Sequence, residues 1–212
     1  MQKAGTTVGS IGTSNTRLHI GSGDAGLLIA GDLDNITPWN STTGASRDAA
    51  VDLGNSGVRF KDLYLSGGAY LGGTGSANHL DDYEEGTFTP NLTFGGSSTG
   101  VTFGFLTGVY IKIGRLVTIR WGFLLTSKGT STGNARITGL PFTIQDLSYA
   151  DAVGTCAGAG YTGLTSVPFT IGVNNNTQIT LSDASSTAQT NLTDANFTNG
   201  TYLFGIFQYT VS

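Results

Sequence analysis

Apolar and polar side chains alternate along much of the chain, and this two-residue period is the pattern of β-strands. The clearest case is residues 116–125, where apolar side chains occupy alternate positions: Val117, Ile119, Trp121, Phe123 and Leu125. This segment predicts a strand with one buried face. Residues 201–211 are instead apolar or aromatic on both faces, which predicts a strand covered on both sides by a second sheet or by a neighbouring chain.

Turn chemistry separates the strand-like segments of the C-terminal part. Stretches containing glycine or asparagine at residues 128–133, 158–163 and 174–176 lie at the spacing typical of a β-sandwich or jelly roll. Composition favours the same fold class. The chain has 33 glycines and only 11% charged residues, too few to supply the i,i+4 pairs that stabilise exposed helices. We therefore expect an all-β protein.

Charge divides the chain into two parts. Residues 1–85 contain ten acids and five bases, a net charge of −5, whereas residues 86–212 contain four acids and five bases, a net charge of +1. We expect a glycine-rich β shaft ending in an acidic connector in residues 1–85. A β-sandwich, jelly-roll-like head is expected in residues 86–212.

The expected shaft contains a faint internal repeat. Residues 11–23 and 53–68 each place a short alternating segment before a glycine-rich turn, which predicts the same structural unit twice. Strands this short bury too little apolar surface to form a core alone. Stacking or intertwining with identical chains would supply the missing contacts.

Several classes of partner are excluded by the sequence. The five bases of residues 86–212 are spread among strand-like residues rather than gathered in a patch, so we expect no nucleic-acid partner. No apolar run approaches the ~20 residues that span a bilayer, and the first residues lack the apolar core of a secretory signal. We expect no membrane insertion. The single cysteine, Cys156, cannot form an intrachain disulfide and is expected to be inert.

Enzyme chemistry is poorly supported in the expected head. Its acids lie in polar, turn-like settings: Asp146, Asp151, Asp183 and Asp194. A glycosidase needs two facing carboxyl groups roughly 5 to 9.5 Å apart, and no histidine follows residue 85 to transfer a proton. We expect no catalytic residues and no enzyme activity.

Two features bear on metal binding. The acidic residues 81–85 form either a solvated connector or, if three copies meet around an axis, a Ca²⁺ site made of carboxylates. His19 and His79 lie far apart in the sequence and would form a zinc site only by meeting their own copies on such an axis. We favour the simpler interpretation of each feature, with no metal and no cofactor.

Loops rich in asparagine and threonine are candidates for binding a saccharide. Short amides and hydroxyls pair with sugar hydroxyls, while an aromatic face stacks on the sugar ring. The residues that we select are Tyr161, Thr162, Asn174, Asn175, Asn176 and Gln178. The loop of residues 185–191 is a further candidate.

One long segment carries a resemblance to a known family. It begins with the run Arg59-Phe60-Lys61-Asp62-Leu63-Tyr64-Leu65-Ser66-Gly67-Gly68 and continues through residues 70–75 and 79–90. This segment resembles the C-terminal region of tailed-bacteriophage tail fibres. With similar stretches at residues 18–28, 37–40 and 108–114, the resemblance covers most of residues 11–145.

The resemblance implies a homotrimer with a repetitive β shaft and a distal β-sandwich head that contacts the host surface. Such fibres are usually longer, so the chain resembles a C-terminal fragment with Met1 as an added start, joined to an upstream tail or baseplate protein. The implied function, at the distal end of the virion's tail fibre, is attachment to a host cell-surface glycan or protein receptor. Three identical weak sites would then act through avidity. Two alternatives stay open: a structural capsid decoration trimer and a glycan depolymerase.

Overall fold

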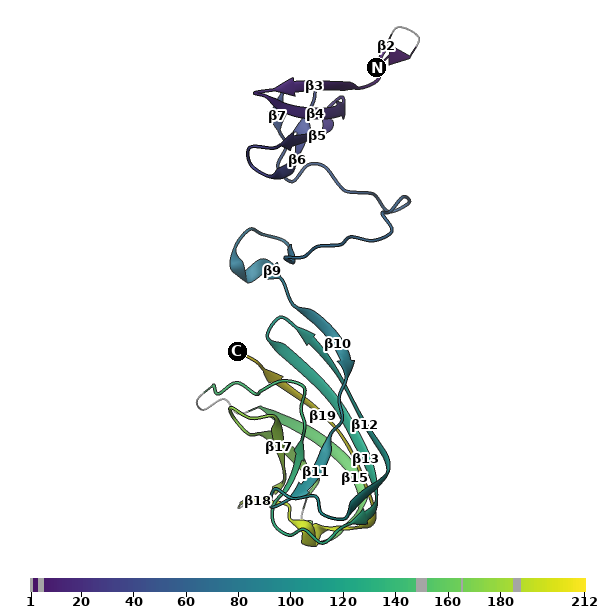
Figure 1. The fold of residues 1–212 in the computed structure, drawn as a ribbon, viewed down its shortest axis with the longest axis vertical. Helices are drawn as coiled ribbons and strands as arrows, with labels where there is room; N and C mark the ends of the chain where they lie inside the picture. The colour runs from purple at the N-terminus through teal and green to yellow at the C-terminus, as the bar shows by residue number, and fades with distance from the viewer. Residues whose placement is uncertain (1, 4–5, 148–151, 165, 185–187) are drawn as a thin grey trace. The chain divides into compact units, whose positions relative to one another are not determined.

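The computed structural model describes the chain except for residues 1, 4–5, 148–151, 165 and 185–187 (Figure 1). The fold is all-β, as predicted, and the described residues contain no α-helix. Two single-turn 3₁₀ helices, η1 (Ser76–Asn78) and η2 (Asp194–Asn196), accompany the strands. None of the described helices is long and apolar enough to cross a membrane. The chain divides into two units, Met1–Tyr64 and Leu65–Ser212.

An antiparallel meander forms most of the N-terminal unit. It follows the short pair β1 (Gln2–Lys3) and β2 (Thr6–Thr7), and its strands are β3 (Ser10–Ser14), β4 (Arg17–Ser22), β5 (Ala25–Ala30), β6 (Asn35–Asn40) and β7 (Ala45–Ser46). A two-residue turn joins β3 to β4, with positive φ at both Asn15 (47°) and Thr16 (67°). Such a turn matches the natural twist of a hairpin.

The two faces of the meander differ in burial. On one face Leu28, Ala30 and Trp39 are buried, each at most 7% exposed. The register places a group of aliphatic side chains on the other face. These side chains are 38% to 63% exposed: Ile11, Leu18, Ile20, Leu27, Ile29 and Ile36. The single chain therefore covers only one side of this sheet.

The predicted repeat does not form the same structure twice. Its first copy contains β3 and β4, but its second copy, residues 53–68, contains no strand. The side-chain oxygen of Asn55 instead accepts hydrogen bonds from the backbone N–H groups of Gly57 and Val58, at 2.9 and 2.8 Å, and makes a local turn. A strand needs a partner to hydrogen-bond with, and this segment has none within the described chain.

The C-terminal unit begins with the small pair β8 (Ala69–Tyr70) and β9 (His79–Leu80) and continues as one ten-stranded sheet. The strand order is β10-β12-β13-β19-β15-β16-β17-β14-β11, and β18 pairs with β17. The bounds are β10 (Tyr83–Thr87), β11 (Asn91–Phe94), β12 (Val101–Ile113), β13 (Leu116–Lys128), β14 (Ala135–Thr138), β15 (Val153–Tyr161), β16 (Phe169–Gly172), β17 (Gln178–Ala184), β18 (Gln189–Asn191) and β19 (Phe197–Thr210). Residues 83–85, expected in the connector, thus lie in strand β10.

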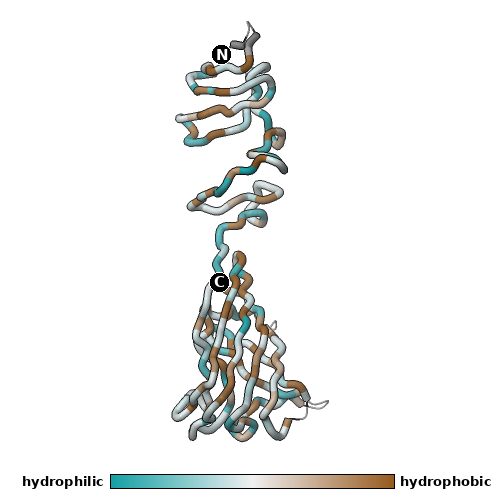
Figure 2. Tube along the Cα trace, turned by 90° about the vertical axis from the view of Figure 1, so that its right-hand side faces the viewer, coloured by the Kyte–Doolittle hydropathy of each residue, from teal (hydrophilic) through white to brown (hydrophobic). Residues whose placement is uncertain are grey.

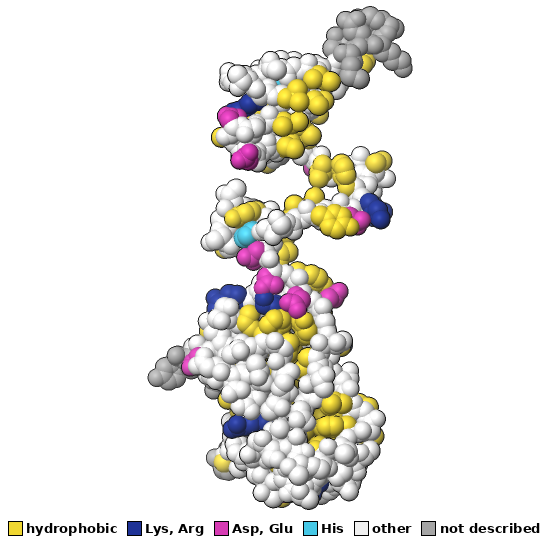
Figure 3. Space-filling model, in the orientation of Figure 1, with side chains coloured by type: hydrophobic (Ala, Val, Ile, Leu, Met, Phe, Trp, Pro, Cys, Tyr) yellow, Lys and Arg dark blue, Asp and Glu magenta, His cyan; other side chains and the backbone are white. Residues whose placement is uncertain are grey.

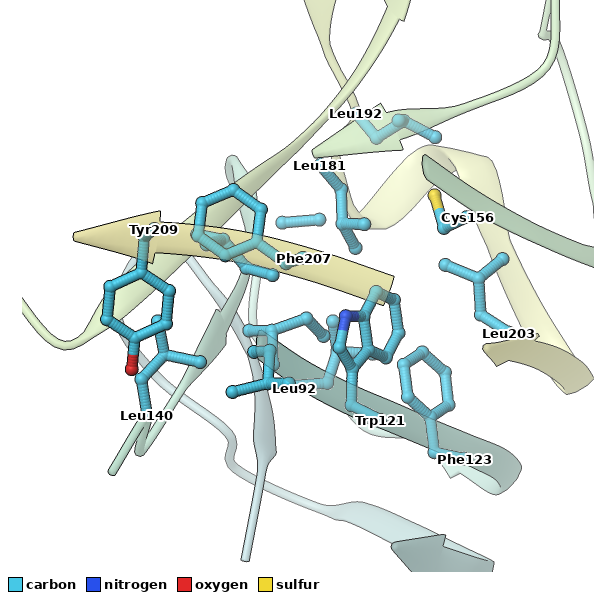
Figure 4. Packing of buried hydrophobic residues seen from close by; sticks show 14 of the residues in the cluster. Leu92, Trp121, Phe123, Leu140, Cys156, Leu181, Leu192, Leu203, Phe207 and Tyr209 are labelled. Atoms are coloured by element: carbon cyan, nitrogen blue, oxygen red, sulfur yellow. The ribbon is translucent and has the colours of Figure 1, made fainter. Parts of the chain in front are cut away.

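This sheet wraps around its own core. Its two edge strands, β10 and β11, are separated in sequence by only residues 88–90, which can bridge at most about 14 Å. The end of β10 therefore lies near the start of β11, although these strands are at opposite edges of the sheet. The sheet forms two layers with apolar side chains between them. Figure 4 shows Leu92 and Leu181 of one layer near Trp121 and Phe207 of the other.

Strand β13 confirms the alternation expected for residues 116–125, because all five predicted core side chains are at most 2% exposed. The tube in Figure 2 shows hydrophobic and hydrophilic residues following one another along the strands of this unit. Strand β19 is covered on one face only within the described chain, so cover of its other face by a neighbouring chain stays a prediction. Leu203 and Phe207 are buried, but Phe204 and Ile206 on the opposite face are 52% and 42% exposed. No second cover for that face lies within the described chain.

Candidate functional site

Three of the selected residues, Asn174 to Asn176, form the turn between β16 and β17. Asn175 has a φ of 57°, a conformation that asparagine tolerates better than most residues. The amide nitrogens of Asn174 and Asn175 each donate to the carboxylate of Asp146, both at 3.3 Å. Backbone hydrogen bonds with Ile144 hold the same turn, at 2.9 Å. The turn is therefore fixed against a second segment.

Gln178 continues this patch as the first residue of β17. Its carbonyl oxygen accepts a hydrogen bond from the backbone N–H of Val173, at 3.0 Å, which closes the turn. The side-chain oxygen of Asn176 accepts from the N–H of Thr177, at 2.9 Å. An amide side chain has two donor hydrogens and an acceptor oxygen. Asn175 can therefore hold the turn and still offer hydrogen bonds to a ligand.

Tyr161 and Thr162 lie elsewhere, at the far end of β15. Strand β15 starts at Val153, opposite Ile171 and near the asparagine turn, and ends at Tyr161, opposite Phe197. Eight residues of strand place its two ends about 26 Å apart. The six selected residues thus form two patches rather than one, and whether either patch binds a ligand stays a prediction. Within the further candidate loop, residues 185–187 lie outside the described residues.

The described head aspartates all hold loops. Asp146 anchors the asparagine turn, as shown above. Asp183 accepts hydrogen bonds from the backbone N–H and the hydroxyl of Ser166, at 2.9 and 2.5 Å. Asp194 accepts from the backbone N–H of Gly133 at 2.8 Å and lies 3.8 Å from the Lys128 amine. Asp151 lies outside the described residues. These contacts are typical of turn-stabilising carboxylates.

Three of the four acids in segment 81–85 have a partner within the described chain, and Glu85 has none. Asp82 forms an ion pair with Lys112, whose side chain is buried. The hydroxyl of Tyr110 donates to Glu84, and this hydrogen bond raises the pKa of Tyr110 above its ordinary value because it favours the neutral hydroxyl. Asp81 lies 3.6 Å from His79. These acids point to different partners, and the described residues contain no cluster of three or more potential metal ligands.

The two histidines have separate surroundings. His79 stacks on Tyr70, with ring centroids 4.4 Å apart, and its Nε2 lies 2.8 Å from the carbonyl oxygen of Gly67. His19 lies in β4 of the N-terminal unit, with its ring 6.1 Å from that of Trp39.

Cys156 belongs to the core of the C-terminal unit. It points inward from β15 and is 4% exposed. Burial raises the pKa of its thiol from 9.0 to about 12, because the thiolate would lose its hydration. At neutral pH the group therefore stays a thiol that is shielded from reagents.

An apolar groove of about 450 Å³ lies on the outer side of β13, β19 and β15. The side chains that border it from outside are Arg120, Thr155, Ala157, Phe204 and Ile206. This groove was not among the sites selected from the sequence. The signal that could have found it is the second apolar face of residues 201–211, together with Arg120 on the polar side of residues 116–125.

No protein-family model matches the chain, and no curated protein matches it. Among solved structures, the crystal structure of the Dettilon tailspike protein is similar, with a TM-score of 0.44 and 20% sequence identity. The similarity covers 59% of this chain and 23% of that protein. The chain therefore spans about a quarter of the length of the structure it matches.

Proposed function

We propose that this chain is the distal part of a phage tail fibre, which attaches the virion to a host bacterial surface as a homotrimer. The observation that carries the proposal is the exposed aliphatic face of the β3–β6 meander. Several aliphatic side chains on one small sheet are costly to keep in water, at about 25 cal/mol per Å² of apolar surface. Identical copies would cover this face, in agreement with the fibre-like sequence of residues 59–90.

The proposed attachment is binding without turnover. The fixed turn at Asn174 to Asn176 presents short amides at one end of the head, and such groups pair with sugar hydroxyls. Three identical copies would raise the effective concentration of the second and third contacts, so each site can be shallow. The carboxylates of Asp146, Asp183 and Asp194 are engaged in holding loops, which supports a binding role over glycan cleavage.

The test combines two measurements: the mass of the purified protein in solution and its binding to host cells. Light scattering of the purified chain should give about 66 kDa, three times its 21.9 kDa, and the fluorescently labelled protein should bind host cells and lose binding when surface glycans are stripped. A mass of one chain at micromolar concentration would contradict the trimer. Reducing sugars released from host polysaccharide would favour a depolymerase, and labelling of the virion head rather than the tail would favour a capsid decoration protein.

A further inference from the structure

The outer face of strands β10, β12, β13, β19 and β15 carries many large apolar side chains. Alternation and register place its large side chains on the same side, and Figure 3 shows hydrophobic side chains at the surface of this unit. These side chains are 40% to 60% exposed: Tyr83, Phe105, Val109, Ile111, Ile113, Leu116, Val153, Tyr202, Phe204 and Ile206. We call this surface the outer apolar face.

The outer apolar face is large enough for a subunit interface. Four strands at about 4.8 Å spacing and eight residues of strand at about 3.3 Å give a flat area of roughly 500 Å² before side-chain relief is counted. A monomer rarely exposes a contiguous apolar patch beyond a few hundred Å², and a standard interface buries about 800 Å² per partner. The groove beside Phe204 and Ile206 adds a recess for a neighbouring side chain.

Two opposite charges lie on this face. Arg120 stands in β13 between Val109 and Ile206, and Glu85 stands in the edge strand β10 opposite Ile111. Two strand spacings of about 4.8 Å and two residues of about 3.3 Å along the strand place their Cα atoms about 12 Å apart. In the described part of the chain neither side chain has a hydrogen bond or an ion pair to another residue.

A second copy of the chain would provide a partner for the apolar side chains of this face and for both of its charges. It would bring an apolar face of matching size, an acid for Arg120 and a base for Glu85. The same partner would also cover the aliphatic face of the β3–β6 meander, so one kind of molecule accounts for both uncovered surfaces. A soluble ligand in the groove would cover Phe204 and Ile206 but leave Ile111, Ile113 and Leu116 in water.

We propose that the outer apolar face is a self-association interface, in which Arg120 of one protomer pairs with Glu85 of its neighbour. The position of this interface is inferred from the C-terminal unit alone, whereas the number of copies, three, rests on the proposed function. Arg120 then marks the middle of the interface and Glu85 its rim, so their pairing sets the register between two heads.

The test is a disulfide between neighbouring copies of the full-length chain. Arg120→Cys and Glu85→Cys are combined in one chain, oxidised, and compared on a non-reducing gel with the pair Thr180→Cys and Glu85→Cys. Because a disulfide needs Cα atoms within about 7 Å, the first pair cannot close within one chain. Thr180 lies on the opposite, polar layer and serves as the matched control. Cys156 is buried and common to both variants. Circular dichroism and light scattering verify folding and mass before oxidation.

The expected result is a covalent trimer for most of the protein carrying Arg120→Cys with Glu85→Cys, and none for the control pair. A covalent dimer would support the interface but overturn the copy number. A non-covalent trimer that gives no covalent species, or that crosslinks equally in the control, would overturn this interface and leave the proposed trimer intact. A monomer by light scattering would overturn both.

A second set of variants covers the case in which either cysteine variant misfolds. The double charge reversal Arg120→Glu with Glu85→Arg should retain the parent mass, because it restores the pair with its signs exchanged. Arg120→Glu alone should weaken assembly at least tenfold. Equal assembly of the parent and both variants would contradict the pairing.

Discussion

The two layers of the C-terminal unit share one core but differ in their outward side chains. Outside β12, β13 and β19 most of the large side chains are aromatic or aliphatic, with Arg120, Thr118 and Gln208 among them. Outside β14 and β17 the chain places only polar residues: Arg136, Thr138, Gln178 and Thr180. Inward side chains of both layers belong to one apolar cluster. Burial within a single chain accounts for the apolar residues that point inward. It does not account for the apolar residues that point outward. The outward contrast indicates which layer faces water and which is covered by something else.

The largest expected effect concerns the core that both layers share. Trp121 is 2% exposed and stacks near Phe123, with ring centroids 6.0 Å apart. Trp121→Ala should destabilise the unit by about 3 to 5 kcal/mol through lost burial and a cavity. Urea denaturation at fixed protein concentration measures this. Thr180→Ala on the polar layer should change stability by less than about 0.5 kcal/mol, and an unchanged midpoint for Trp121→Ala would mean that this side chain is not in the core.

The difference between the outward faces of the two layers can be tested by placing one new carboxylate on each face. Phe204→Asp puts a carboxylate in the middle of the outer apolar face, while Thr180→Asp puts the same group on the polar layer. We expect the first to weaken assembly by about 2 kcal/mol or more, because a covered charge must be paired or hydrated, and the second to leave assembly unchanged. Sedimentation velocity measures both. If the two variants assemble alike, the outward contrast carries no information about assembly.

Alkaline pH tests the shared core. Burial raises the pKa of Cys156 from 9.0 to about 12 and that of Tyr209 from 10.0 to about 12. The folded state thus keeps both groups protonated, so their contribution is complete below the unfolded pKa values and is lost as pH rises from about 9 towards 12. For Cys156 the loss at pH 10 is about 1.4 kcal/mol. Denaturation at pH 8 and pH 10 should show this drop, and Cys156→Ala should reduce it; an equal drop in the variant would contradict the assignment.

The smallest effect on stability is expected at the asparagine turn, which leads into β17 of the polar layer. Asn174→Ala combined with Asn175→Gly removes both amides that contact Asp146 while glycine keeps the positive φ of residue 175. Stability should fall by about 1 kcal/mol or less, but attachment to host cells should fall more, because the loss is repeated in each copy. Thr162→Ala in the other patch is the matched comparison. Undiminished attachment by the double variant would exclude this turn from the receptor site.

Local alternation was enough to predict much of the core. The burial of Val117, Ile119 and Trp121 follows from the two-residue period of β13, whichever strands lie beside it. The second copy of the repeat was predicted wrongly for a related reason. Residues 53–68 have a strand-like pattern, but a pattern does not supply the neighbouring strand that completes the hydrogen bonds.

Which of the selected residues lie together in space depends on how distant strands pair, and a local sequence pattern does not show this. Tyr161 and Asn174 are near in sequence, yet they lie at opposite ends of the sheet. Tyr161 ends β15, and β16, which runs antiparallel to β15, leads the chain back towards Asn174. Asp146 was noted as a turn aspartate, but its contact with a turn 28 residues later follows from how the strands pack. The pairing of Glu85 with Ile111, which sets its position relative to Arg120, likewise depends on strand register.

The short link of residues 88–90 limits how this protein can associate. A sheet with an open edge can recruit further strands without end, which is the route to fibrils. Here the two edge strands, β10 and β11, have only five and four residues, and the link joins the end of the first to the start of the second, so neither presents a long edge to a neighbour. Contacts between copies are left to the broad faces of the sheet, and such contacts end once the faces are covered. We therefore expect copies of this unit to form a closed assembly rather than a fibril.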